Sequence, residues 1–61
     1  MKYEQLEEIV DGCALLRYND RLYAIAGSEN GKFVFADIKD DSRIRATYDE
    51  ILQNKEYAVA Y

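Results

Sequence analysis

The chain has 61 residues and a formal net charge of −4, with twelve acidic and eight basic side chains, no histidine and one cysteine. A chain of this length holds one domain, residues 1–61, and so small a domain buries only a modest core. One cysteine excludes an internal disulfide and a zinc site, and the acidic balance disfavours nucleic acid, whose phosphates need lysine and arginine.

The first residues predict a short amphipathic helix over residues 3–10. Its apolar positions fall at helical spacing and form one stripe, comprising Tyr3, Leu6, Ile9 and Val10. Glutamates and a glutamine occupy the other face, and Gly12 follows where a left-handed C-cap would end the helix. So short a helix depends on packing, because its intrinsic propensity is too weak to hold it alone.

Cys13 begins an apolar run directly after this helix. A cysteine nucleophile needs a base, and the chain has no histidine to supply one, so we expect a small buried hydrophobe. An unpaired thiol suits a reducing compartment. The first ten residues show no apolar core of a signal peptide, and no segment approaches the ~20 apolar residues of a membrane span. We therefore expect a cytoplasmic protein that does not bind membranes.

Three strands are predicted in succession, over residues 13–18, 21–28 and 32–38. Asn19-Asp20 joins the first two as a two-residue hairpin turn. Asn30-Gly31 joins the second and third, and it is the strongest hairpin signal in the chain because both positions tolerate positive φ.

The second half of the chain predicts a fourth short strand over residues 43–46, after the polar turn Asp40-Asp41-Ser42. Thr47 and Glu50 form a capping box at the start of a helix that runs to Asn54. Residues 56–61 alternate in polarity and predict a closing strand. The fold class is therefore α+β and β-rich, an antiparallel meander or small barrel of three to five strands with an N-terminal helix and a short helix before the last strand.

Two-residue turns fix which side chains share a face of the sheet. Regular pairing puts one apolar set on one face, comprising Leu16, Tyr23, Ile25, Val34 and Ile38. The opposite face then carries Cys13, Leu15, Ala24, Ala26, Phe33 and Phe35. Because an isolated antiparallel sheet normally has one wet face, two apolar faces indicate a small barrel with a helix lid, helices on both sides, or an interface. The phenylalanine face is interpreted as core, with a partner interface as the alternative.

Several short motifs resemble those of a known group of proteins. They comprise Leu16-Arg17 followed by the Asn-containing turn and Tyr23, then Tyr48-Asp49-Glu50 with Leu52, and the closing stretch 55–61. These are similar to motifs of small, mostly uncharacterised proteins from phages and mobile elements of Gram-positive bacteria, although Ala58 and Asp20 stand where that group has Asp and Gly. The strand order resembles a Src-homology-three-like small barrel. The resemblance implies a phage or mobile-element origin and brings no catalytic residues.

Six tyrosines in 61 residues are the best positive evidence for binding, because tyrosine is enriched in interface cores. The alternative is that they cap a small core with their hydroxyls in water. The candidate partner-binding residues are Phe33, Phe35, Tyr18, Tyr48, Tyr57, Tyr61, Asp40 and Asp41. We predict a non-enzymatic module, without cofactor or metal, that binds a protein, either a host protein or a second copy as a homodimer.

Two other functions stay open. The first is an acidic inhibitor of a host nucleic-acid enzyme, such as an anti-CRISPR-like mimic of nucleic acid, which would use the acids of the first helix and the later ones, Asp37, Asp40, Asp41, Asp49 and Glu50. The second is a small RNA- or DNA-binding barrel that uses Arg17, Arg21, Arg43 and Arg45. Asp37, Asp40 and Asp41 also have spacing for a hard cation, but a solvated acidic turn is the expectation.

Overall fold

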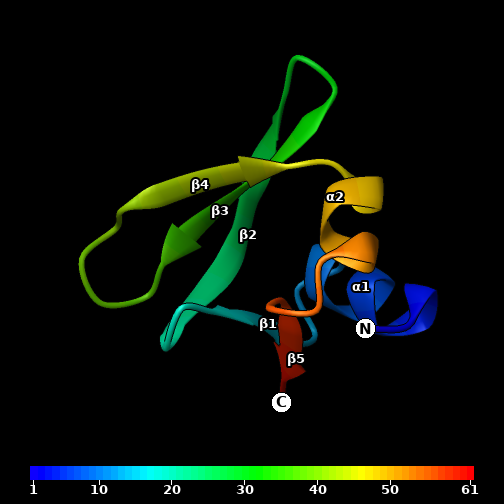
Figure 1. Ribbon diagram of the computed structural model, residues 1–61. Helices are drawn as coiled ribbons and strands as arrows, with labels where there is room; N and C mark the ends of the chain where they lie inside the picture. Colours follow the sequence, from blue (N-terminus) through cyan, green and yellow to red (C-terminus); the bar gives the residue numbers. More distant parts are fainter.

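A computed structural model describes residues 1–61, the whole chain, as a curled sheet with two helices (Figure 1). In chain order the elements are α1 (Tyr3–Val10), β1 (Leu15–Tyr18), β2 (Arg21–Glu29), β3 (Lys32–Asp37), β4 (Arg43–Ala46), α2 (Tyr48–Gln53) and β5 (Ala58–Ala60). All neighbouring strands are antiparallel. The predicted class, α+β and β-rich with an N-terminal helix and a short helix before the last strand, is confirmed.

The five strands form one sheet in the order β4-β3-β2-β1-β5. The first four make a meander, and the chain then crosses through α2 so that β5 pairs with the free side of β1. The sheet curls into a half-barrel with β4 and β5 as its two open edges. Both helices lie on the same side of this sheet (Figure 1). The sheet therefore has an inner face toward the helices and an outer face away from them.

Local sequence signals explain the ends of the elements. The Thr47 hydroxyl accepts a hydrogen bond from the Glu50 amide at 3.2 Å, and the Glu50 carboxylate accepts one from the Thr47 amide at 2.9 Å, which completes the predicted capping box. Asn30 and Gly31 have φ of 52° and 80°, as a two-residue hairpin turn between twisted strands requires. Asn19 and Asp20 adopt positive φ in the same way.

The core lies between the helices and the inner face of the sheet. Its eight buried residues are Leu6, Ile9, Ala14, Leu16, Tyr23, Phe35, Ala46 and Ile51. Phe35 is fully buried, and the two helices contribute Leu6, Ile9 and Ile51. Burial of each such aliphatic or aromatic side chain stabilises the fold by about 1.5–3 kcal/mol, which holds two helices that are too short to persist alone.

The register between β2 and β3 differs from regular pairing. Glu29 faces Lys32 and Gly27 faces Val34, as predicted, but Ile25 faces Phe35. The predicted pairing of Ile25 with Ala36 and of Tyr23 with Ile38 is therefore wrong. The cause is a β-bulge between Ile25 and Gly27, which adds one residue to β2.

The bulge depends on Gly27, whose φ is +148°. A residue with a side chain rarely adopts this conformation, so glycine permits the bulge where another residue would resist it. On the turn side of the bulge, the hairpin turn fixes the pairing of Glu29 with Lys32. On the other side, Tyr23 pairs with Asp37 of β3 and with Leu16 of β1.

The bulge exchanges two pairs of residues between the faces of the sheet. Phe33 and Phe35 join Tyr23 and Ile25 on the inner face, so their predicted opposition to Tyr23 and Ile25 is wrong. The core interpretation is confirmed for Phe35, which is fully buried, whereas Phe33 is half-buried against the core. Val34 and Ile38 lie on the outer side with Leu15 and Ala24, rather than beside Leu16. The outer apolar residues are Leu15, Leu22, Ala24, Val34, Ala36, Ile38, Ala58 and Ala60.

Two expectations near the ends of strands need correction. Cys13 is exposed, and β1 begins at Leu15 rather than at residue 13. The Cys13 amide donates to the Glu8 carbonyl at 2.8 Å, so this segment completes the C-terminus of α1 instead of pairing in the sheet. β5 is shorter than the expected 56–61, since a turn held by Asn54 occupies the residues before Tyr57.

Candidate functional site

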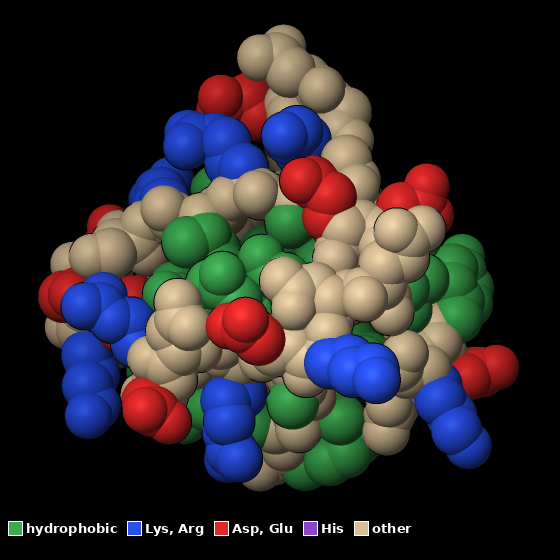
Figure 2. Space-filling view, in the orientation of Figure 1, with side chains coloured by type: hydrophobic (Ala, Val, Ile, Leu, Met, Phe, Trp, Pro, Cys, Tyr) green, Lys and Arg blue, Asp and Glu red, His purple; other side chains and the backbone are tan.

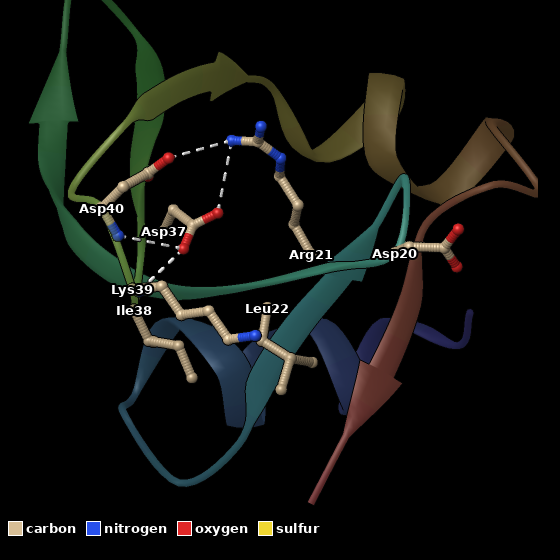
Figure 3. Close-up of a pocket in the computed structure, with 7 residues that line it drawn as sticks. All are labelled: Asp20, Arg21, Leu22, Asp37, Ile38, Lys39 and Asp40. Atoms are coloured by element: carbon tan, nitrogen blue, oxygen red, sulfur yellow. Dashed lines mark hydrogen bonds and ion pairs between the residues drawn. The ribbon is translucent and has the colours of Figure 1, made fainter.

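Arg21 connects two aspartates at one end of the sheet (Figure 3). One guanidinium nitrogen lies 3.5 Å from the Asp37 carboxylate and 3.4 Å from that of Asp40. Arg21 begins β2, Asp37 ends β3, and Asp40 lies in the following turn. The cluster therefore ties the turn between β3 and β4 to β2.

Asp37 is the only buried charged side chain, with 7% of its surface exposed. Its second carboxylate oxygen accepts hydrogen bonds from the Lys39 and Asp40 amides at 2.7 and 3.4 Å. A buried carboxylate needs such partners because desolvation is costly. With one oxygen on the turn amides and the other on Arg21, Asp37 acts chiefly as an organiser of the turn.

The three aspartates of this turn do not converge on one point. Asp40 accepts from the Ser42 amide at 2.9 Å, and hydrogen bonds from Ser42 lower the pKa of the Asp40 carboxyl. Asp41 points to Arg43 at 3.6 Å instead. No group of three acidic or cysteine side chains in the chain has the geometry to hold a metal ion. The acidic turn is thus built from Asx-type hydrogen bonds and ion pairs.

A hollow of about 330 Å³ adjoins the Arg21 cluster. Its lining comprises Asp20, Arg21, Leu22, Asp37, Ile38, Lys39 and Asp40. In Figure 3 the Leu22 and Ile38 side chains extend to the opposite side of β2 from Arg21 and its aspartates. Arg21, Asp37 and Asp40 pair with one another in the hollow, whereas Leu22 and Ile38 continue into the outer face of the sheet.

The predicted tyrosines occupy three separate places. Tyr18 and Tyr57 stack with ring centroids 4.2 Å apart, and both are half-buried against the core. Burial, followed by the neighbouring Tyr18, raises the pKa of the Tyr57 hydroxyl. This pair joins the end of β1 to the segment before β5 and covers the edge of the core, an arrangement that fits the alternative interpretation of these tyrosines.

Tyr48 lies in a second aromatic group with Phe33 and Tyr3, at centroid distances of 4.9 and 5.4 Å. Burial raises the pKa of the Tyr48 hydroxyl, and Tyr3, Glu7 and Asp11 add to the shift. Tyr48 and Phe33 are half-buried, while Tyr3 is 50% exposed. This group covers the junction of α1, α2 and the inner face of the sheet.

Tyr61 is 81% exposed, and its hydroxyl donates to the Glu8 carboxylate at 2.8 Å, which raises the pKa of Tyr61. Of the eight candidate partner-binding residues, Phe35 is not accessible in this fold, because it is fully buried. The others are at least partly exposed but do not form one surface. A binding role for them stays a prediction.

The outer face of the sheet is the largest feature that sequence reasoning did not isolate. Cross-strand pairs place Ala24 opposite Ala36, Leu15 opposite Ala60, and Leu22 opposite Arg17. None of the outer apolar residues belongs to the main core cluster or to the side chains packed against it, although Val34 is itself buried, with 5% of its surface exposed. Ile38, at the end of this face, is 51% exposed. Neither helix covers these residues: Ile38 and Ala58 are exposed, and the others apart from Val34 are half-buried.

Three arginines lie on this face, together with Glu29 and Lys32 at its hairpin end. Arg17 lies between Leu22 of β2 and Ala58 of β5, while Arg43 and Arg45 lie opposite Ala36 and Val34. Arg43 and Arg45 form ion pairs with Asp41 and Glu29, and Arg17 forms none. Arg21 is engaged elsewhere, so three of the four arginines share the outer face.

The acidic residues of α1 and its C-cap form a negatively charged surface, in contrast to the arginines of the outer face. Glu4, Glu7, Glu8 and Asp11 recur at helical spacing, away from the buried Leu6. None of the four takes part in an ion pair. Figure 2 shows acidic and basic side chains around a central hydrophobic area on one side of the molecule.

No protein-family model, curated protein or solved structure matches this chain. Neither helix has the length and apolar character needed to cross a membrane.

Proposed function

We propose that this chain is a small non-enzymatic module that binds another protein through the outer face of its sheet. The observation that carries the proposal is the contrast between the two faces. The inner face packs on both helices, whereas neither helix covers the outer face, where Ile38 and Ala58 are exposed and the other apolar residues except the buried Val34 are half-buried. Contiguous apolar surface on a small domain commonly marks an interaction site.

The titratable groups support binding rather than catalysis. The exposed Cys13 has no histidine to activate it, and the buried Asp37 is fully engaged by Arg21 and two amides. A nucleophile and a base within hydrogen-bond reach are the usual signature of acyl or group transfer. The chain is proposed to act by occupying a partner's surface, and its resemblance to small phage proteins makes a Gram-positive bacterium the first source in which to look for that partner.

The test compares two variants that add the same charge at different places. Ala24→Glu puts a carboxylate in the middle of the outer apolar face, and Gln53→Glu puts one on the exposed side of α2. Both tagged proteins, and the wild type, are used to capture proteins from a nuclease-treated bacterial lysate. We expect Ala24→Glu to lose the partner that the wild type and Gln53→Glu retain, with all three melting temperatures alike. Equal capture by all three would overturn the proposed face.

A second candidate function rests on the unpaired acids of α1. Glu4, Glu7 and Asp11 give the helix a negative surface suited to a basic groove, such as that of a nucleic-acid enzyme. As an inhibitor, the chain would lose its partner when these three residues are changed to glutamine or asparagine, and would keep it in Ala24→Glu. The same capture experiment therefore separates the two functions.

A further inference from the structure

We infer that the occupant of the outer face is an acidic amphipathic helix of the partner protein. This inference rests on the proposed function and adds the chemistry and shape of the partner. Its basis is the arrangement of apolar and cationic residues across four neighbouring strands. An apolar strip runs along β2 and β3, and it comprises Leu22, Ala24, Ala36 and Ile38, which are exposed or half-buried.

Arginines flank this strip on both sides. Arg43 and Arg45 lie on β4, next to β3, and Arg17 lies on β1, next to β2. Strands are spaced by about 4.8 Å, so the two flanks are about 14 Å apart. An α-helix with its side chains is about 10–12 Å across. In a helix laid along the strip, the polar side chains on either side of its apolar stripe would therefore lie within reach of the arginines.

The residues at the centre of the strip are small. Ala24 and Ala36 lie opposite each other, with Leu22 and Ile38 toward one end and the buried Val34 toward the other. Alanines let a helix approach the sheet closely, while the larger Leu22 and Ile38 provide apolar contact at one end. A partner helix with an apolar stripe of two to three turns matches this pattern.

The arginines are free to exchange partners. Arg43 and Arg45 are about half exposed, and their pairs with Asp41 and Glu29 span 3.6 and 3.4 Å at the surface. Exposed pairs of this kind contribute little, so carboxylates of a bound helix can replace them. Arg17 has no acidic partner at all. The flanks thus favour glutamates or aspartates on both sides of the apolar stripe of the helix.

Two other occupants fit less well. Nucleic acid could contact the arginines, but its backbone leaves the apolar strip without a partner, and the net charge of −4 opposes it. A second copy docked face to face would bring arginines toward arginines around the strip. An acidic amphipathic helix satisfies both the strip and its flanks.

The experiment places a photoreactive benzophenone amino acid at position 24, and in a control protein at position 53, in the full chain. Each protein is irradiated in bacterial lysate without nuclease, and the cross-linked peptide or nucleic acid is identified by mass spectrometry. We expect position 24 to cross-link a protein segment with an apolar stripe flanked by acids, and position 53 to give no such product. A synthetic peptide of that segment is then titrated against wild type and Arg17→Gln/Arg43→Gln/Arg45→Gln.

The triple variant should raise the dissociation constant roughly tenfold, since three surface pairs at about 0.5 kcal/mol each sum to about 1.5 kcal/mol. A peptide with its acids changed to glutamine should bind both proteins alike. A cross-linked segment that is basic or extended, a second copy, or nucleic acid would overturn the inference. Of these, a basic or extended segment of another protein would leave the proposed function standing. Absence of any product at position 24 would overturn both.

Discussion

Phe35→Ala is the most direct test of the face assignment. Phe35 is fully buried between Leu16, Tyr23 and the helices. Removing a buried phenylalanine ring costs about 3–5 kcal/mol. A domain of this length has a free energy of unfolding of about 3–9 kcal/mol, at ~0.05–0.15 kcal/mol per residue. The substitution should therefore remove most of the stability, and lower the melting temperature by at least about 12 °C.

The assay is urea unfolding followed by circular dichroism at 25 °C, with thermal unfolding as a second measurement. Phe33→Ala is the matched control, because Phe33 lies on the same face but is only half-buried, so its loss of stability should be clearly smaller. If Phe35→Ala lowered the free energy of unfolding by less than about 1 kcal/mol, Phe35 would lie outside the core and the bulged register would be refuted.

Two further predictions concern the bulge and the second helix. Gly27→Ala should cost about 1–3 kcal/mol in urea unfolding, because φ of +148° strains any side chain; a loss no larger than that of Ser28→Ala would contradict this. Hydrogen bonding to Thr47, aided by Lys32, lowers the pKa of Glu50 below 4.5, so its stabilising effect holds above pH 4.5 and disappears as the pH falls through the lowered value. Glu50→Gln should therefore flatten the acid limb of the stability profile measured by thermal unfolding, and Asp49→Asn, which lacks the capping bond, should not.

Elements defined by short-range chemistry could be predicted from the sequence. The α-helix over residues 3 to 10 and the strand over residues 43 to 46 have the expected ends, and the Thr47 capping box forms as predicted. Each depends on residues within one turn of each other, where capping and turn rules apply. The prediction that Cys13 is buried in a strand was wrong, because a short-range hydrogen bond to the preceding helix competes with strand pairing. Its apolar neighbours suggested a strand, but its amide is taken by the carbonyl of Glu8 at the end of α1.

The candidate site needed the structure because it depends on register over longer distances. Both faces of the predicted sheet are apolar, so hydrophobic pattern alone does not pin the pairing of β2 with β3. Gly27 was the available signal, since an isolated glycine within a strand often marks a bulge. A bulge at Gly27 places Phe33 and Phe35 on the same face as Tyr23 and Ile25.

The bulge therefore links the fold to the proposed function. It allows the two large rings to fill a core that two short helices can cover, and it leaves the smaller Ala24 and Ala36 at the centre of the outer face. Regular pairing would have placed both rings on the uncovered side, where exposed aromatic strands invite aggregation. With small residues there, the outer face can stay in solvent while the chain is free and still accept a helix between its flanking arginines.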